Sequence, residues 1–147
     1  MFNLKAKFML AAAVLFIGGV SGANAQLVDG STINVAVSSP FVLRDKTFEA
    51  GVYSIERTPS TADSPSVLIL RGEGETMIFD TIIDRSNAAA ENTQLVFETI
   101  GGTNYLSAIV VKGQTTKNGI ARSKAQARAI ADGVSVTQTV MIANTGF

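Results

Sequence analysis

The chain has 147 residues, with 12 Lys or Arg, 12 Asp or Glu and a formal net charge of zero, and 46% of its residues are hydrophobic. It contains no histidine, cysteine or tryptophan. Their absence excludes Ser-His-Asp and Cys-His nucleophilic sites, metals held by histidine or thiolate, and tryptophan platforms for sugars. The near-neutral charge argues against nucleic acid as a partner.

Residues 1–25 have the pattern of a cleavable signal peptide. Two lysines precede an apolar run over residues 8–20, and Ala23-Asn24-Ala25 has the small residues that a signal peptidase recognises. The run is shorter than the roughly 20 residues of a transmembrane helix, and a lipoprotein anchor would require a cysteine. We therefore expect cleavage before Gln26, and a bacterial domain (residues 26–147) that is periplasmic or extracellular.

The expected mature domain is mildly acidic. Removing the two leader lysines leaves 10 basic residues (12 − 2) against 12 acidic ones, a formal net charge of −2. Residues 26–98 hold 11 of the acids, whereas residues 99–131 hold five bases and no acid. We expect the two halves to pair in one fold and partly neutralise each other. Without cysteine, packing and backbone pairing must stabilise it.

The first strand is expected over residues 31–37, where apolar and polar side chains alternate. Pro40 has no amide hydrogen to donate to a sheet, so it should break this strand before residues 41–43 resume it. Residues 44–46 (RDK) are expected to form a polar turn.

A corner is predicted at residues 49–52 (EAGV), with Gly51 at positive φ in a type II turn. Residues 53–57 then alternate as a strand. Phe48 and Tyr53, on the two arms of this corner, are expected to pack together in the core.

The next segments predict a hairpin after a loop at residues 58–66. Residues 66–71 (SVLILR) form a continuous apolar run, typical of a strand that is buried on both faces. Gly72-Glu73-Gly74 should turn it into a second strand over residues 76–83.

A second hairpin is predicted further along the chain. Residues 84–93 are polar and alanine-rich, which favours a loop or one weak helical turn. Residues 94–100 and 104–111 should then pair across Gly101-Gly102, a dipeptide suited to positive φ. Two hairpins of the same design indicate an antiparallel meander.

After Gly113 the pattern changes. Residues 119–132 are rich in good helix formers, and Gly133 follows where a C-cap is expected, so we predict one short helix over about 120–132. Its apolar face is mostly alanine, so its burial should contribute little free energy. We expect the helix to lie flat against a sheet edge. Residues 134–142 alternate as a final strand. The sequence thus predicts an all-β fold, an antiparallel β-sandwich or small barrel of about eight strands with one short helix.

Candidate chemistry is sparse. Asp80 and Asp84 should lie on one side of an extended segment but about 13 Å apart, at about 3.3 Å per residue, which is too far for a glycosidase pair. Asp63 lies among serines and threonines but lacks the regularly spaced acids of a calcium loop. The basic segment 112–128 carries no aromatic residue, which favours a solvated face over a nucleic-acid site. We therefore predict no catalytic, cofactor-binding or metal-binding residues.

Two stretches, FVLRDKTFEAGVYSIER (41–57) and LVFETIGGTNYLSAI (95–109), carry a resemblance. Their F-x-A-G-x-Y turn and later L-V-F strand, Gly turn and Y-L-S strand resemble a family of small exported bacterial proteins of unknown function. The resemblance covers most of residues 33–125, implies an all-β exported domain and brings no catalytic residues. That family typically ends soon after a basic segment, here Arg122-Ser123-Lys124, so the strand at 134–147 departs from its pattern.

The function expected from the sequence is that of an exported, non-enzymatic β-domain, a binding or structural component of the envelope, surface or matrix. Its partner would be an envelope or matrix protein, or a second copy of the chain. Three alternatives remain. The chain could self-assemble by donating strand 134–142 to a neighbour's open sheet edge, act as a carboxylate-dependent hydrolase with converging acids, or form a small outer-membrane barrel.

Overall fold

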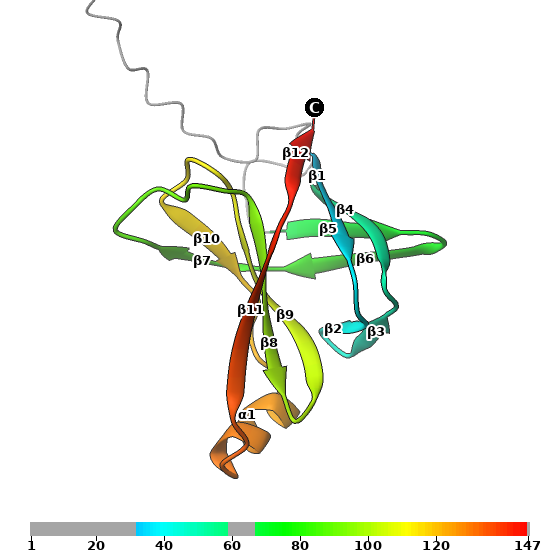
Figure 1. Cartoon of the computed structure of the whole chain (residues 1–147), viewed down its shortest axis with the longest axis vertical. Coiled ribbons are helices and arrows are strands. Elements are labelled where there is room, and N and C mark those ends of the chain that lie inside the picture. The colour runs from blue at the N-terminus through cyan, green and yellow to red at the C-terminus, as the bar shows by residue number, and fades with distance from the viewer. Residues whose placement is uncertain (1–31, 59–66, 147) are drawn as a thin grey trace, which may run out of the picture.

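The computed structural model describes residues 32–58 and 67–146, which form two β-sheets and one helix (Figure 1). Sheet A has the order β12-β1-β4-β5-β6. Its strands are β1 (Thr32–Val37), β4 (Gly51–Arg57), β5 (Val67–Gly72), β6 (Glu75–Asp80) and β12 (Asn144–Gly146). Sheet B has the order β11-β8-β9-β10-β7, with β2 beside β9 and β3 beside β2. Its strands are β2 (Phe41–Leu43), β3 (Lys46–Phe48), β7 (Ile82–Arg85), β8 (Gln94–Ile100), β9 (Thr103–Val110), β10 (Thr116–Gly119) and β11 (Val136–Ile142).

The pairing is antiparallel apart from one parallel contact between β2 and β9, and one hydrophobic core takes side chains from both sheets. The predicted all-β sandwich is therefore confirmed. The expected signal peptide and most of the expected loop, including Asp63, lie outside the described residues.

Among the described residues, four connections carry the chain from one sheet to the other: Glu49 and Ala50 lead from β3 into β4, and the other three are as follows. β1 leads into β2 across residues 38–40, β6 into β7 across Thr81, and β11 into β12 across Ala143. The expected break at Pro40 is thus confirmed, and it is a change of sheet. The edge strands of sheet A are β12 and β6, and the ends of the main path of sheet B are β11 and β7. The connections β6–β7 and β11–β12 therefore join the two sheets along both of these sides.

The corner at Thr81 corrects the prediction of a single strand over residues 76–83. Thr81 is buried, and its hydroxyl donates a hydrogen bond to Asn118 Oδ1 at 3.3 Å. Asp84 and Arg85, which were expected in a loop, belong to β7. An apolar pattern looks the same on both sides of a bend, so the sequence did not reveal where the chain leaves sheet A.

Strand β10 was also missed. Its sequence, TKNG, lacks the β-branched and aromatic residues that favour strands, apart from one threonine. It forms because it pairs with β9 on one side and with β7 on the other. Tertiary pairing therefore overrides its weak local preference.

The predicted type II turn at Gly51 is wrong. Gly51 does not adopt positive φ; it opens β4 and pairs with Val37 of β1, which requires extended backbone. Positive φ occurs instead at Arg44 (φ 59°), in the two-residue turn between β2 and β3. Glu49 and Ala50 form the connection from sheet B to sheet A.

The core is centred on four aromatic rings. Phe41 stacks on Phe48 with ring centroids 5.4 Å apart, and it makes T-shaped contacts with Tyr53 and Phe97, with centroids 5.2 and 5.6 Å apart. The expected packing of Phe48 on Tyr53 is confirmed, with centroids 6.0 Å apart. The Tyr53 hydroxyl donates to the Glu49 carbonyl. Burial raises the pKa of the Tyr53 hydroxyl, and so do the nearby carboxylates of Glu75 and Glu49.

The predicted glycine turns of both hairpins are confirmed. β5 and β6 pair up to Gly72 and Glu75, and Gly74 in their turn has φ 73°. β8 and β9 are joined by Gly101 and Gly102, both at positive φ. The central residues of β5 are buried on both faces, as the apolar run predicted.

The helix is shorter than expected, because α1 covers Lys124–Ala131. It begins at a capping box that the sequence analysis missed: Gln126 N donates to Ser123 Oγ at 3.2 Å, and Ser123 N donates to Gln126 Oε1 at 2.8 Å. It ends in a Schellman motif, in which Gly133 N donates to Ile130 O, so the expected C-cap glycine is confirmed. Its alanine face is not the buried one; the buried side chain is Gln126.

Replacing Ser123 with alanine is expected to destabilise α1 by about 1 kcal/mol, because one end of the capping box is lost. Hydrogen exchange of the amides in Lys124–Ala131 would measure this as faster local opening. Ser135→Ala, at an exposed position beyond the helix, is the matched control. Equal exchange in the two variants would contradict the role of the cap.

Candidate binding groove on the outer face of sheet B

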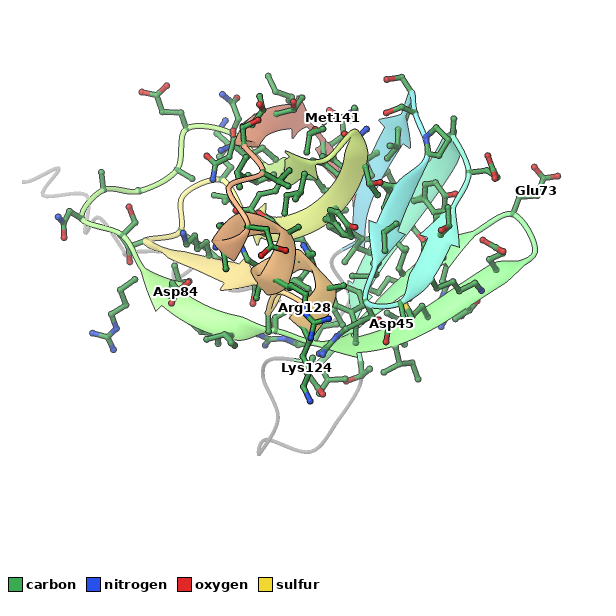
Figure 2. All side chains as sticks on the ribbon, turned by 90° about the horizontal axis from the view of Figure 1, so that it is seen from below. Asp45, Glu73, Asp84, Lys124, Arg128 and Met141 are labelled. Atoms are coloured by element: carbon green, nitrogen blue, oxygen red, sulfur yellow. The ribbon has the colours of Figure 1, made fainter. Side chains whose placement is uncertain are left out.

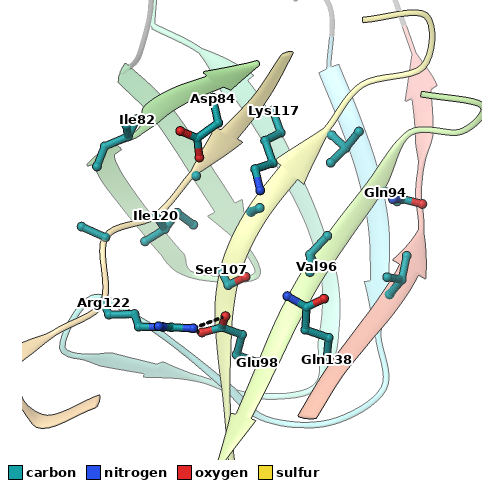
Figure 3. Close-up of a pocket in the computed structure, with 15 residues that line it drawn as sticks. Ile82, Asp84, Gln94, Val96, Glu98, Ser107, Lys117, Ile120, Arg122 and Gln138 are labelled. Atoms are coloured by element: carbon teal, nitrogen blue, oxygen red, sulfur yellow. Dashed lines mark hydrogen bonds and ion pairs between the residues drawn. The ribbon is translucent and has the colours of Figure 1, made fainter. Parts of the chain in front are cut away.

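A groove of about 480 Å³ lies on the face of sheet B that points away from the core (Figure 3). Strands β7 to β11 all contribute side chains to it, and so does the segment between β10 and α1. The apolar lining includes Val96, Val110 and Val140. Charged and polar side chains surround these valines, so the groove is amphipathic.

The most ordered polar feature of the groove is the pair of Glu98 and Arg122. Arg122 donates two hydrogen bonds to the carboxylate, from Nε to Oε2 at 3.0 Å and from Nη2 to Oε1 at 2.8 Å (Figure 3). The Glu98 side chain is 8% exposed, whereas that of Arg122 is 47% exposed. The hydrogen bonds and charge of Glu98 raise the pKa of Arg122. A bidentate pair of this kind holds both side chains in one orientation.

The backbone explains how Arg122 reaches Glu98. Glu98 lies in β8, and Arg122 lies three residues beyond the end of β10. Ile120 N donates to Ser107 O at 2.8 Å, which continues the pairing with β9 and directs the following residues over the sheet. The contact joins residues 24 positions apart. From the sequence, Arg122 was expected only as part of a solvated basic segment.

Two further charged side chains lie at the other end of the groove. Asp84 in β7 and Lys117 in β10 occupy directly opposite positions, and both line the groove (Figure 3). A Cβ placed on Gly119 would lie 3.3 Å from Asp84 Oδ2. The missing side chain of Gly119 therefore leaves the space in which the carboxylate lies.

The two carboxylates considered from the sequence do not form a site. Asp80 ends β6 in sheet A, where Arg44 Nη2 donates to its carbonyl oxygen at 3.1 Å and lies 3.9 Å from its carboxylate. Asp84 lies beyond the corner, in sheet B. Within residues 32–58 and 67–146, no three acidic residues come together in a way that could hold a metal ion.

The basic segment is divided by the fold. Arg122 is bound to Glu98, while Lys124 and Arg128 project from α1, and Lys124 shares a shallow hollow with Asp45 (Figure 2). Lys112 and Lys117 are exposed. All five bases are exposed, as expected for a solvated face, and Arg122 in addition forms an ion pair with Glu98.

A second hollow, of about 590 Å³, lies beside residues 49–53 in sheet A and carries the carboxylates of Glu49, Glu73 and Glu75. Glu75 Oε1 lies 3.7 Å from Lys46 Nζ. Glu73, at the tip of the β5–β6 hairpin, and Asp84 lie at opposite ends of the molecule (Figure 2). The two hollows are therefore separate, and of these two the groove on sheet B is the one with charges of both signs.

Comparison with protein-family models, curated proteins and solved structures gives no match to this chain. The resemblance to small exported bacterial proteins stays a prediction. The class that the structure defines is a two-sheet β-sandwich with one short helix. A search of the described residues for a helix with the length and apolar character to span a membrane finds none.

Replacing Arg122 with methionine is expected to lower the free energy of unfolding by about 1–3 kcal/mol, because the buried Glu98 carboxylate would lose both donors. Arg85→Met, at an exposed position, should change it by less than about 0.5 kcal/mol. Urea denaturation of both variants, of Glu98→Gln, and of Arg122→Met combined with Glu98→Gln measures the coupling between the two side chains. Equal stability of the two arginine variants would contradict a structural role for the pair.

Proposed function

We propose that this chain is an exported, non-enzymatic β-domain, a binding or structural component of the cell envelope, the cell surface or the extracellular matrix. The groove on sheet B is its binding surface. A single observation carries the proposal: five strands and the segment after β10 place apolar side chains, one bidentate ion pair and two further opposite charges on one face.

The state of Glu98 supports binding over catalysis. Both carboxylate oxygens accept hydrogen bonds from Arg122, and the side chain is nearly buried. A general base needs an oxygen that can reach a proton on the substrate. A carboxylate held in this way instead fixes the shape and charge of the surface around it.

The lining also indicates the kind of partner. Valines suit an apolar part of a ligand, while Asp84 and Lys117 suit groups of opposite charge close together on it. An extended peptide segment with mixed side chains has both properties. An envelope or matrix protein with such a segment is therefore the proposed partner.

Export rests on the signal-like pattern of residues 1–25 and on the lack of cysteine. Expression of the full chain in a Gram-negative bacterium, followed by fractionation and mass spectrometry, tests it. The expected product begins at Gln26 and lies in the periplasm or the medium. A full-length product that stays in the cytoplasm would refute export.

Binding is tested with two matched substitutions on opposite sheets. Ser107→Arg places a large side chain in the groove, whereas Ile78→Arg adds the same side chain to β6, where Ile78 is already 64% exposed. The immobilised processed chain and both variants are incubated with solubilised envelope and matrix fractions. Proteins retained by the wild type and by Ile78→Arg, but lost with Ser107→Arg, are the expected result. Equal retention by all three chains would rule out the groove as the binding surface.

A further inference from the structure

Strand β11 forms one edge of sheet B. It pairs with β8 over seven residue positions, from Val136 opposite Ile100 to Ile142 opposite Gln94. In the part of the chain that the structure describes, no strand pairs with the other edge of β11 (Figure 1). That edge therefore presents backbone donors and acceptors that no described strand pairs with.

The sequence of β11 is unusual for an exposed edge. Natural edge strands commonly carry charged residues, proline or bulges, which prevent pairing with other chains. The opposite edge of sheet B follows this pattern, because β7 contains Asp84 and Arg85. In contrast, β11 (VTQTVMI) is seven residues long and has no charge, proline or glycine.

Three apolar side chains of β11 are exposed on the outer face: Val136 at 36%, Val140 at 50% and Ile142 at 70%. They share one face of the strand, where Gln138 lies between Val136 and Val140. These side chains lie directly beside the free edge. A strand added to this edge would cover part of them.

The strand is also self-complementary. Residues 136–140 read Val-Thr-Gln-Thr-Val in both directions, with Gln138 at the centre. In an antiparallel pair of two copies centred on Gln138, Val136 lies opposite Val140 of the second copy, and Gln138 lies opposite its own equivalent. Threonine then meets threonine and valine meets valine, which are favourable cross-strand pairs. A two-fold interface requires this kind of self-match.

We propose that two copies of the chain associate through antiparallel pairing of their β11 strands, in the register centred on Gln138. The free edge can accept an added strand, and the palindromic sequence of residues 136–140 indicates that this strand is the β11 of a second copy. Each β11 keeps its pairing with β8 in its own chain, so the association adds strands edge to edge without exchanging them. This differs from the strand donation considered from the sequence.

The pairing has a consequence for the groove. The two-fold axis runs perpendicular to the sheet at Gln138. The two copies of sheet B therefore join into one continuous sheet, to which each copy contributes the five strands β11, β8, β9, β10 and β7. Both grooves then open on the same face. The dimer would present two identical binding surfaces side by side, and a partner with repeated segments would bind both.

The lack of native cysteine allows a direct test of the register, because any introduced cysteine is the sole thiol. Directly opposite residues of antiparallel strands have Cα atoms about 4.5–5.5 Å apart, within disulfide range. Gln138→Cys alone should therefore give a disulfide dimer under mild oxidation. A mixture of Val136→Cys and Val140→Cys should cross-link as the heterodimer, whereas Val136→Cys alone should not, because its two copies lie about 13 Å apart. Ile78→Cys, on β6 and more exposed than Val136 or Val140, is the control for random collision.

A charge test in solution needs no covalent bond. Val136→Lys combined with Val140→Lys places lysines opposite each other twice, and the corresponding double glutamate variant does the same with carboxylates. Light scattering should give a dimer for the wild type at high concentration, monomers for each variant alone, and a mixed dimer when the two variants are combined. Circular dichroism checks that each remains folded.

A wild type that stays monomeric at millimolar concentration would overturn the proposal. So would a dimer that both charge variants still form alone, or disulfide yields for Gln138→Cys no higher than for Ile78→Cys. Cross-linking of Val136→Cys with itself would refute the register.

Discussion

Replacing Phe41 with alanine is expected to lower the free energy of unfolding by about 3–5 kcal/mol, the largest effect of any single substitution considered for this chain. Phe41 is 1% exposed, and its ring contacts those of Phe48, Tyr53 and Phe97. Alanine would leave a cavity and remove three aromatic contacts, each worth about 0.5–1.5 kcal/mol beyond burial. Small domains have a total stability of about 5–15 kcal/mol, so the variant should be close to unfolding.

Denaturant unfolding followed by tyrosine fluorescence and circular dichroism measures this loss. Phe41→Leu keeps most of the apolar volume and should cost less than the alanine variant. Ile78→Ala, at a side chain that is 64% exposed, should stay within about 0.5 kcal/mol of the wild type. If Phe41→Ala were no less stable than Ile78→Ala, the aromatic cluster would not be the centre of the core.

The second large effect is expected at Gly72, where alanine should lower the free energy of unfolding by about 1–3 kcal/mol through overpacking. A Cβ built on Gly72 would lie 2.5 Å from Cε1 and 2.8 Å from Cδ1 of Tyr53. The ring cannot move away easily, because Phe41 and Phe48 pack against it and its hydroxyl donates to Glu49. Glycine is therefore required at this position by space, since its φ is not in the left-handed region.

Gly51→Ala is the matched control for Gly72→Ala. Both glycines lie in sheet A next to Tyr53, but a Cβ on Gly51 would lie 3.8 Å from Cε2, an ordinary contact. Since Gly51 also lacks positive φ, alanine there should be neutral or stabilise by about 0.4–1 kcal/mol through the unfolded chain. Thermal and urea unfolding of both variants would test the contrast, and a larger loss at Gly51 would contradict it.

The groove and the β11 edge lie on the same sheet, but different substitutions test them. Val140 belongs to both, because it lines the groove and is one of the exposed apolar side chains of β11. Ser107 lies in β9, two strands away from the edge, so Ser107→Arg should affect partner binding without affecting self-association. Loss of dimers with Ser107→Arg would show that the two surfaces are not independent.

Much of the strand pattern was predictable because it depends on the alternation of neighbouring residues. Ile33, Val35 and Val37 alternate in sequence and point into the core, as expected. The glycine turns of the two hairpins and Gly133 after the helix were correctly assigned. Gly74, Gly101, Gly102 and Gly133 all have positive φ, a local property that glycine adopts without steric cost. The capping box of Ser123 and Gln126 is equally local and was open to prediction from its spacing.

The candidate groove was not predictable in the same way. Glu98 is one charged residue in an alternating strand, and Arg122 is one of five bases in a polar segment. Their pairing depends on β10, a strand with weak local preference that exists because β9 and β7 flank it. Sequence spacing alone therefore carries no sign that the two side chains meet.

The sequence by itself determined the all-β class, the two glycine hairpins, the late helix and its final glycine, because alternation and backbone freedom are properties of a few adjacent residues. Tertiary structure alone decided the corner at Thr81, the extended form of Gly51, the ion pair of Glu98 and Arg122, and the free edge of β11. Each of these results from which strands lie side by side and where they bend from one sheet into the other. Such choices minimise the energy of contacts between distant segments, so no local pattern encodes them.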